Sequence, residues 1–512
     1  MNITQLGILK QDLGWQQILE QEGIIFNTLS TIPAQYLAPI IVNRQIDKSE
    51  IPDLQTFIKN GGAILTDFPN LKNIIDNFNY QTTKISYILN DGSDSFNNIT
   101  AVDLELPGYL CAGRTRIYQS SFGKGYIIAL PFDVNQAICD TRNEQKPFYY
   151  PSRKFPNEIV SVVSKGAVRK LVVNCLRTLF NKMNLPYVHL WYYPKDYKSV
   201  FSFRVDTDYS PEKALKVTYD LEEKTDIRFT YFVNTKEHPN ITNSDKDFQI
   251  HCYIHKVFKD YQKNYDNIKK AKSILEYNSI KPIGFVSPFG LWNENLQKAM
   301  EDCGIQYSSE FSLSYDDLPF FPIIENKRSN VLQIPVHPIC IGRLVHAGLT
   351  PEKCFDYYKR YFAKQVQANE PLFIYDHPHR IAQFPDVFIL ILNNAKKLPD
   401  IWLTNMTEFY HWWKVRLSAL SKTKWQIENQ SLKVETQNQD SRLYLHIITP
   451  NNKQAFVPLK QTIYNLKDLG CKSILMTQKP DNKNYKRLKS KRTRLQMNFY
   501  QTIDAILHLI KR

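Results

Sequence analysis

The first part of the chain alternates apolar runs with an amphipathic, helix-like segment. Apolar runs at residues 23–29 (GIIFNTL), 36–43 (YLAPIIVN) and 63–67 (AILTD) predict strands. The amphipathic stretch at 51–60 stops at a Gly-Gly pair and predicts a helix. Short strands joined by helical crossovers predict a parallel, flavodoxin-like α/β domain. Two further predicted elements are a strand at 125–130 and a helix at 162–182.

The pattern changes in the middle of the chain. Residues 186–198 (PYVHLWYYPKDYK) combine prolines and aromatics without a period, which predicts a domain boundary. After residue 416, short β-like runs at 432–435, 443–448 and 472–477 precede a predicted helix near 495–511. We therefore predict three domains: an α/β domain at 1–190, a central α/β domain at 197–416 and a small β-rich domain at 417–512.

Composition supports a folded protein. Of the 512 residues, 43% are hydrophobic and 22% charged, a composition that is ordinary for folded domains. A chain of this length is too long for a single hydrophobic core. The first residues have no secretory-signal pattern, and no run of about 20 apolar residues predicts a membrane span. The eight cysteines form no CxxC pair, which favours reduced thiols. We expect a cytoplasmic protein.

The formal net charge of +15 raises the question of an anionic partner. Cations concentrate near the carboxyl terminus, where a solvated surface is the simpler interpretation and an anion or membrane-surface site is the alternative. This basic run consists of Lys483, Lys486, Arg487, Lys489, Lys491, Arg492 and Arg494.

Histidines concentrate in the central domain, where eight of the eleven fall between His238 and His411. The β-rich run at 200–205 ends in Asp206 and Asp208, whose spacing directs both carboxylates to one side of a continuing strand. His251 and His255 are four residues apart, so on a helical turn they would share one face. Two imidazoles and one carboxylate suit zinc, and also cobalt or iron.

The order Asp-x-Asp and then His-x-x-x-His resembles the first two motifs of the polysaccharide deacetylases, the NodB-homology carbohydrate esterases of family 4. Their third motif ends in Pro-Tyr/Phe-Gly, as Pro288-Phe289-Gly290 does, and a later motif supplies a histidine that His377 matches. The resemblance covers residues 198–416. It implies an irregular (β/α) barrel for this part of the chain.

The resemblance also implies a role for each matched residue. Asp208, His251 and His255 would hold one divalent metal, and Asp206 would be the general base. The backbone N–H of Phe289, in the segment that begins at Pro288, would stabilise the oxyanion. His377 would protonate the leaving group. The implied reaction removes N- or O-acetyl groups from a carbohydrate.

The third motif departs from the family pattern at one position. Val286 stands where the family has an arginine that orients the base, and the nearby acids that could accompany it are Glu310 and the pair Asp316 and Asp317. Arg204 lies two residues before Asp206 and points to the same side at strand periodicity. We hypothesise that Arg204 compensates the charge of the base, with a purely structural ion pair as the alternative.

The amino-terminal part weakly resembles glutamine-amidotransferase-like domains, through its Gly-Gly turn and the later GKGYIIALPFD strand. Catalytic members need a cysteine at a tight elbow with a histidine nearby. Cys111 lacks that context, and His189 is the nearby histidine. We interpret Cys111 as structural and the domain as non-catalytic.

Three functions are consistent with these residues. The first is a metal-dependent deacetylase, the second a hydrolase of another non-peptide C–N bond, and the third a non-catalytic relative that binds glycan or a partner. The retained Asp206 favours an enzyme. His337 could line the pocket or simply end a strand, and Arg343 and His346, in a predicted loop, could meet an anionic substrate. His379 could orient His377.

Overall fold

The computed structural model describes residues 5–33, 36–142, 155–156, 158, 160–242, 245–428, 430–473 and 499. The backbone divides into two compact units: unit 1 comprises 1–140, 167–196 and 412–480, and unit 2 comprises 141–166, 197–411 and 481–512. The basic run at 483–494 lies outside the described residues, as does the predicted terminal helix apart from residue 499. The three-domain division stays a prediction.

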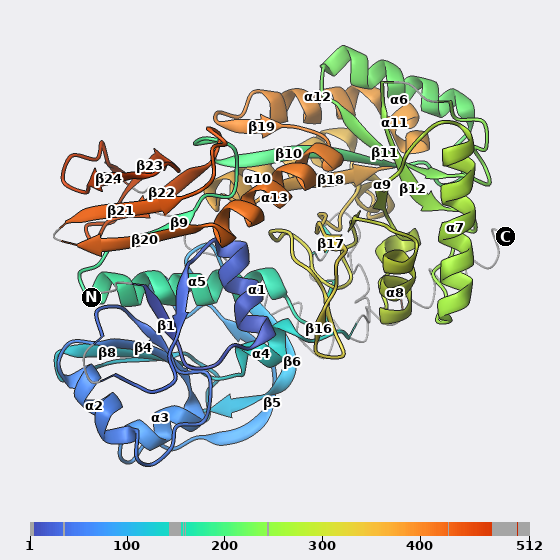
Figure 1. The fold of residues 1–512 in the computed structure, drawn as a ribbon. Coiled ribbons are helices and arrows are strands. Elements are labelled where there is room, and N and C mark those ends of the chain that lie inside the picture. The colour runs from blue at the N-terminus through green and yellow to red at the C-terminus, as the bar shows by residue number, and fades with distance from the viewer. Residues whose placement is uncertain are drawn as a thin grey trace. The chain divides into compact units, whose positions relative to one another are not determined.

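Unit 1 contains an α/β sheet built largely as the apolar pattern predicts. The strand order is β2-β1-β3-β4-β8-β7, and all neighbours are parallel except β7 and β8. Figure 1 labels β1, β4 and β8 of this sheet. The strands are β1 (Leu6–Ile8), β2 (Phe26–Thr28), β3 (Ile40–Ile41), β4 (Ala63–Asp67), β7 (Tyr118–Phe122) and β8 (Gly125–Leu130). The helices are α1 (Leu13–Glu22), α2 (Ile51–Lys59), α3 (Phe68–Ile74), α4 (Val134–Ile138) and α5 (Lys165–Lys182).

The strand predicted at 23–29 begins too early by comparison with the observed strand β2. Gly23 has a φ of 80° and ends α1, a helix that the apolar pattern did not predict. A left-handed glycine is a common helix stop, and its N–H bonds to the carbonyls of Leu19 and Glu20. The chain therefore becomes a strand only at Phe26.

The carboxyl-terminal strands belong to unit 1. Strand β22 (Tyr444–Ile448) pairs antiparallel with β9 (Tyr187–Leu190), which lies in the segment predicted to be a domain boundary. The sheet order there is β25-β23-β22-β9, and a second sheet runs β20-β21-β24. Their remaining strands are β20 (Thr423–Glu428), β21 (Ser431–Thr436), β23 (Lys453–Pro458), β24 (Thr462–Asn465) and β25 (Lys472–Ser473). A two-stranded sheet elsewhere in unit 1 joins β5 (Gln81–Leu89) and β6 (Ala101–Leu110).

Unit 2 is built on a curled half-barrel of eight parallel strands, which confirms the predicted α/β class for this part of the chain. The order is β17-β14-β13-β12-β11-β10-β18, with β19 also paired to β10. The strands are β10 (Ser199–Asp206), β11 (Phe229–Asn234), β12 (Asp247–Cys252), β13 (Gly284–Phe285), β14 (Tyr307–Ser308), β17 (Leu332–Gln333), β18 (Leu372–Asp376) and β19 (Ile401–Leu403). A small antiparallel pair joins β15 (Ile323–Ile324) and β16 (Lys327–Arg328).

Helices follow most of these strands, as expected for parallel crossovers. They are α6 (Glu212–Thr225), α7 (Tyr261–Tyr277), α8 (Glu294–Asp302), α9 (Ile341–His346), α10 (Pro351–Gln367), α11 (Pro378–Gln383), α12 (Pro385–Lys396) and α13 (Met406–Ser421), the last crossing the division between the units. Every residue of β10 is buried, so this strand is a central element of the sheet. Within the described residues, none of the helices has the length and apolar character to cross a bilayer.

Candidate metal centre

Chemically reactive side chains collect at the carboxyl ends of the parallel strands. Asp206 ends β10, His251 lies near the end of β12 and His377 follows β18. In α/β folds this edge carries the functional side chains, because each strand ends there in a loop that can present polar groups. The site residues predicted from distant parts of the sequence therefore lie along one edge of one sheet.

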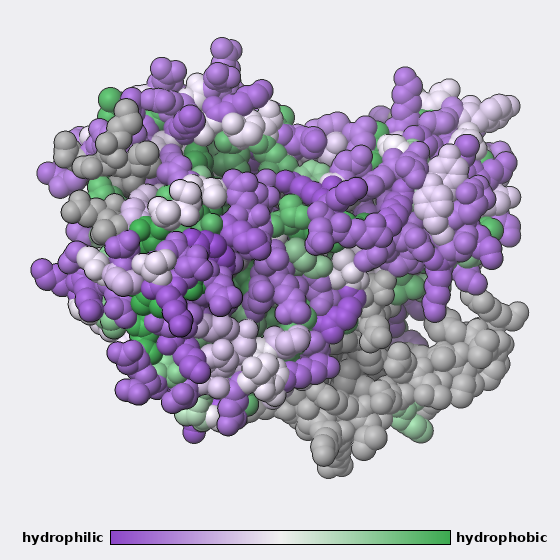
Figure 2. Space-filling model, turned by 60° about the horizontal axis from the view of Figure 1, so that its bottom comes forward, coloured by the Kyte–Doolittle hydropathy of each residue, from purple (hydrophilic) through white to green (hydrophobic). Residues whose placement is uncertain are grey.

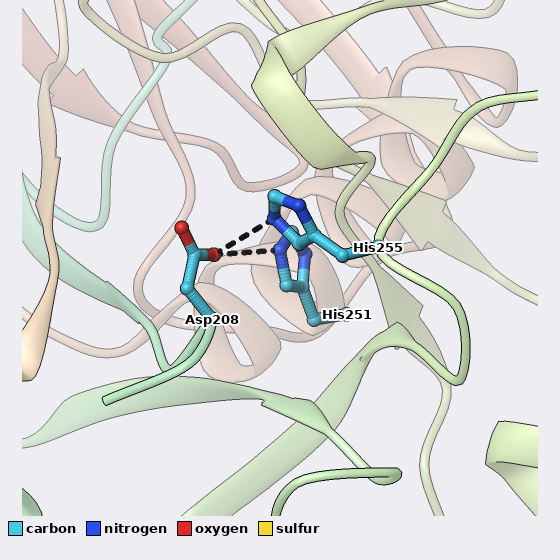
Figure 3. Close-up of side chains that lie close together, drawn as sticks. All are labelled: Asp208, His251 and His255. Carbon is cyan, nitrogen blue, oxygen red and sulfur yellow. Dashed lines mark hydrogen bonds and ion pairs between the residues drawn. The ribbon is translucent and has the colours of Figure 1, made fainter. Parts of the chain in front are cut away.

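Asp208, His251 and His255 point at one another, as Figure 3 shows. The Oδ1 atom of Asp208 lies 2.9 Å from His251 Nε2 and 3.1 Å from His255 Nε2. Around a zinc ion with bonds of about 2.0–2.1 Å, two ligand atoms would be about 2.9 Å apart at a right angle and about 3.3 Å apart at the tetrahedral angle. The three side chains thus have the spacing of a metal-ligand set.

The hydrogen bond between His251 Nδ1 and the main chain shows why Asp208, His251 and His255 suit a cation. His251 Nδ1 lies 3.0 Å from the carbonyl oxygen of Val286, which can only accept, so Nδ1 carries a proton. In the neutral ring, Nε2 then directs a lone pair at the carboxylate of Asp208. Two acceptors that face each other at 2.9 Å need a second proton or a cation between them. The donor set therefore fits a divalent metal.

The predicted helical turn for the two histidines is wrong. His251 belongs to β12, and His255 lies in the loop that follows. This loop is fixed by Asn267, whose Oδ1 accepts the N–H groups of Tyr253 and Ile254 at 3.0 and 2.6 Å. The bend after β12 turns His255 back toward Asp208. The two histidines are thus brought together by this bend and not by a helical turn.

Asp206 is held by Arg204 in a buried, two-pronged ion pair. Arg204 Nε donates to Asp206 Oδ1 at 2.8 Å, and a terminal nitrogen donates to Oδ2 at 2.6 Å. The other terminal nitrogen donates to the carbonyl and the hydroxyl of Ser309. Both charged side chains are almost fully buried. Arg204 therefore fixes the orientation of the Asp206 carboxylate, and its part in a reaction remains a prediction.

His377 faces the other oxygen of Asp208. Its Nε2 lies 3.4 Å from Asp208 Oδ2, and its Nδ1 lies 3.6 Å from Asp376 Oδ1. Burial alone would lower the pKa of His377, but the negative charges of Asp208 and Asp376 outweigh it and raise the pKa to about 9. Burial alone would likewise raise the pKa of Asp208. When protons rather than a cation lie between the groups, the charge of His377 and hydrogen bonds from His251 and His255 hold this pKa well below its usual range.

Asp376 is a site residue that the sequence reasoning missed. Its two carboxylate oxygens accept the N–H groups of Ile341 and His377 at 2.7 and 2.9 Å. With Cys340 and His377 it also forms a second group whose possible ligand atoms lie within 4.8 Å of one another. Its position in the sequence could have identified it. An acid that ends a buried strand directly before a candidate histidine can orient that histidine by contact with the ring nitrogen that faces away from the metal.

The segment matched to the third motif lies next to this cluster. Pro288, Phe289 and Gly290 form a single 3-10 turn, in which Phe289 has a φ of 62°. Behind it, the buried Glu310 accepts the N–H of Ser287 at 3.2 Å and the amide of Gln333 at 2.8 Å. Burial raises the pKa of Glu310 to about 7. Of the acids considered beside the variant motif, Glu310 is thus the one that supports this turn.

The other candidate residues have different surroundings. His337 binds Asp316 through Nδ1 at 3.0 Å and the Tyr357 hydroxyl through Nε2 at 2.7 Å. The predicted loop at Arg343 and His346 is wrong, because both belong to α9. His379 Nδ1 lies 3.3 Å from the hydroxyl of Ser210, and its ring centroid is 5.5 Å from that of His377. Asp317 accepts from the N–H of Leu318.

In unit 1, Cys111 and His189 have separate partners. Cys111 packs against the hydrophobic cluster of the first sheet. Both ring nitrogens of His189 are engaged, Nδ1 with the carbonyl of Glu22 at 2.8 Å and Nε2 with His446 Nδ1 at 2.9 Å. His189 is therefore not oriented as a base for the thiol.

Comparison with known proteins gives likenesses to solved structures. No known family model matches the chain, and no curated protein matches it. A putative polysaccharide deacetylase from Mycobacterium smegmatis is 15% identical, over 44% of this chain and 93% of that one, with a TM-score of 0.39. A probable polysaccharide deacetylase from Pseudomonas aeruginosa PAO1 is 16% identical, over 43% and 91%, with a TM-score of 0.36. A CE4 family pseudoenzyme from Bacillus anthracis is 14% identical, over 42% and 66%, with a TM-score of 0.28. At these identities and TM-scores the likenesses concern the fold alone, over less than half of this chain.

Proposed function

We propose that unit 2 is a metal-dependent hydrolase that removes acetyl groups from a carbohydrate. The observation that carries the proposal is the placement of a held carboxylate, Asp206, and a histidine, His377, on the same strand edge as a metal-ligand set. A binding module could keep the ligands for stability, but it has no need of a second, separately held carboxylate beside them.

Asp208, His251 and His255 would hold the metal, with zinc the best fit and cobalt or iron as alternatives. A divalent cation bound there supplies Lewis acidity, which polarises an acyl carbonyl and acidifies water. The lone-pair arrangement of His251 against Asp208 supports this assignment.

The proton transfers fall to two side chains. Asp206 would accept a proton from the attacking water, and Arg204 keeps its carboxylate oriented through two hydrogen bonds. His377 would donate a proton to the departing amine or alcohol, because its Nε2 lies 3.4 Å from Asp208 Oδ2, on the same strand edge as the proposed ligands. The N–H of Phe289 would donate to the oxyanion.

Acetate release from N-acetylglucosamine oligomers by the full chain, after metal removal and reloading with zinc, cobalt or iron, tests the proposal. Asp206→Asn should lower turnover about 10²- to 10⁴-fold with unchanged metal content in the folded protein, because the base is lost while the three proposed metal ligands stay in place. Asp220→Asn, at an exposed position on α6, is the matched control and should behave as wild type.

Two outcomes would redirect the proposal. Bound metal without turnover on any acetylated sugar would favour the non-catalytic binding function. Turnover on small amides but not on acetylated sugars would favour hydrolysis of another C–N bond.

A further inference from the structure

Exposed lysines begin directly after the second histidine of the metal-ligand set. Residues 256–270 hold five lysines and two aspartates, a formal net charge of +3. All five lysines are exposed: Lys256, Lys259, Lys263, Lys269 and Lys270. Among the described residues, the neighbouring Lys272 pairs with Glu276, whereas none of the five forms an ion pair. The positive charge that raises the question of an anionic partner is therefore concentrated here within the described part of unit 2.

Exposed charge alone does not distinguish a binding surface from ordinary solvated surface. Figure 2 shows that the described surface is mostly hydrophilic on the face it draws, with hydrophobic residues in small patches. The feature that distinguishes residues 253–259 is how firmly their main chain is held. A loop that is fixed before it meets a ligand avoids the free-energy cost of being ordered on binding.

Asparagine side chains of α7 hold the loop that leads from His255 to this helix. Asn267 Nδ2 donates to the carbonyl of Ile254 at 2.9 Å, in addition to the two N–H groups that its Oδ1 accepts. Asn264 binds Phe258 twice, because its Oδ1 accepts the N–H and its Nδ2 donates to the carbonyl, both at 2.9 Å. The loop is therefore attached to α7 at two points.

Asparagines at the amino-terminal end of α8 hold the same loop. Asn293 Nδ2 donates to the carbonyl of Phe258 at 3.0 Å, and Asn295 Nδ2 donates to the carbonyl of Lys259 at 2.7 Å. The helices α7 and α8 lie side by side (Figure 1). The loop is thus anchored to both helices, which fixes the backbone positions of Lys256 and Lys259.

Two lysines lie over aromatic rings of the anchored loop. Lys256 Nζ is 5.5 Å from the ring centroid of Phe258, and Lys270 Nζ is 6.0 Å from that of Tyr253. A ring attracts a cation above its face, which restricts the side chain without neutralising its charge. Lys263 is seven residues before Lys270, so both lie on one face of α7. We call Lys256, Lys259, Lys263 and Lys270 the lysine surface.

We propose that the lysine surface binds the anionic groups of an acidic polysaccharide whose acetylated sugar lies at the metal centre. The inference rests on the proposed function and specifies the chemical class of its substrate. The anchored loop carries a metal-ligand candidate, His255, and a cation, Lys256, in adjacent positions. Lysine ammonium groups are point charges without the planar fork of arginine, so the surface selects charge along a chain and not one anion geometry.

The same contacts favour a polysaccharide over a nucleic acid. Single-stranded nucleic acids are held by bases that stack on open aromatic faces. The rings of Tyr253 and Phe258 are partly buried, and an ammonium group lies over each. The charge of the surface is therefore available to a polyanion, whereas these two rings offer little area for base stacking.

Titration calorimetry on the full chain supplied with zinc tests the proposal with two oligomers. One alternates N-acetylglucosamine and glucuronate, and the other is the same chain with its carboxylates reduced to alcohols. Lys256→Gln/Lys270→Gln should weaken binding of the acidic oligomer about two- to 30-fold and leave binding of the reduced oligomer unchanged. The loss should shrink between about 0.1 M and about 1 M salt, because the Debye length falls from about 10 Å to about 3 Å.

Two further double variants serve as controls. Lys256→Arg/Lys270→Arg keeps both charges and should bind the acidic oligomer as wild type does. Lys353→Gln/Lys359→Gln removes the same charge from exposed positions on α10 and should also match wild type. Unchanged affinity of Lys256→Gln/Lys270→Gln for the acidic oligomer, or an equal loss in the α10 control, overturns the proposal.

Single-stranded DNA with the same number of charges is the competing polyanion. If Lys256→Gln/Lys270→Gln loses affinity for DNA but not for the acidic oligomer, the surface belongs to nucleic acid and the proposal is overturned. Acetate release from both oligomers is measured separately. Lysine-dependent binding without acetate release supports the surface and counts against the proposed function, whereas acetate release with an unchanged KM in the glutamine variant does the reverse.

Discussion

Two histidine clusters in this chain use similar residues to opposite effect. In unit 2, imidazoles face carboxylates, and the pKa of His377 rises to about 9. In unit 1, His189 and His446 face each other at 2.9 Å within an aromatic core, and burial lowers the pKa of both well below the usual range. Proximity of histidines alone therefore does not indicate a metal site. The sign of the neighbouring charge and the direction of the lone pairs distinguish the two clusters.

The acids of the two clusters differ in the same sense. Glu22 in unit 1 is completely buried, and its two oxygens accept the hydroxyls of Tyr187 and Tyr192 at 2.7 and 2.6 Å. Asp208 in unit 2 remains 21% exposed and directs one oxygen at two imidazoles. The charge of Glu22 is thus satisfied by hydrogen bonds within unit 1. In unit 2, the Asp208 oxygen and two imidazole nitrogens converge on one point as possible ligand atoms.

The largest expected effect concerns the buried ion pair of unit 2. Arg204→Met should lower the free energy of unfolding by about 3–5 kcal/mol, because it leaves the Asp206 carboxylate buried without its partner. Denaturant unfolding of the full chain measures this. The double variant Arg204→Met/Asp206→Leu should recover most of the loss, since no uncompensated charge remains.

Arg416 of unit 1 is the comparison for Arg204, because it is equally buried but donates to the main-chain carbonyls of Glu20, Gln21, Leu190 and Trp191. Arg416→Met should cost less, about 1–3 kcal/mol, because neutral acceptors are left unpaired. A loss below about 1 kcal/mol for Arg204→Met would contradict the importance assigned to its charge.

The next effect separates the two clusters by their affinity for metal. Asp208→Ala should weaken zinc binding more than about 100-fold, which exceeds the typical effect of removing an outer-shell partner. His446→Gln should leave zinc binding unchanged, because His189 and His446 belong to neither group of possible ligands found among the described residues. Titration calorimetry with zinc on the metal-free chain measures both. Equal losses in the two variants would remove the distinction between the clusters.

The sequence predicted the parts of the site that depend on local pattern. The buried run before Asp206 and the order of acids and histidines are readable from neighbouring residues, because strand burial and strand ends leave local signals. The bend that carries His255 was not readable, since it depends on Asn267 of the following helix. The contact of Arg204 with Asp206 could be hypothesised from their spacing of two residues, but the support from Ser309 comes from the residue that follows β14, about a hundred positions later.

Strand pairings between distant parts of the chain could not be predicted either, because they leave no local pattern in the sequence. Strand β9 has no alternation of its own, and it becomes a strand because β22, more than 250 residues later, supplies its hydrogen bonds. Tertiary partners of this kind override local propensity. Asp376 was likewise missed, because its role appears only once His377 and Ile341 are seen to share it.

A smaller effect should appear in the pH dependence of stability of unit 1. His189 and His446 have depressed pKa values when folded, so their stabilising contribution is present above the unfolded pKa of about 6.5 and is lost as the pH falls below it. The free energy of unfolding should fall by up to about 1.4 kcal/mol per pH unit for each histidine. His446→Gln should halve this slope between pH 6.5 and 5, and His411→Gln, at an exposed position, should not change it. An unchanged slope in His446→Gln would contradict the assignment.

The smallest expected effect is a shift in the titration of His377. In the metal-free protein its raised pKa means that its contribution to stability is complete below about 6.5 and is lost as the pH rises through about 9. Zinc should lower this pKa by at least about one unit, because a cation at Asp208 cancels the nearest negative charge. Asp208→Asn should lower the pKa without metal. NMR titration of the His377 Cε1–H resonance measures each case, and the same pKa with and without zinc would show that the metal lies elsewhere.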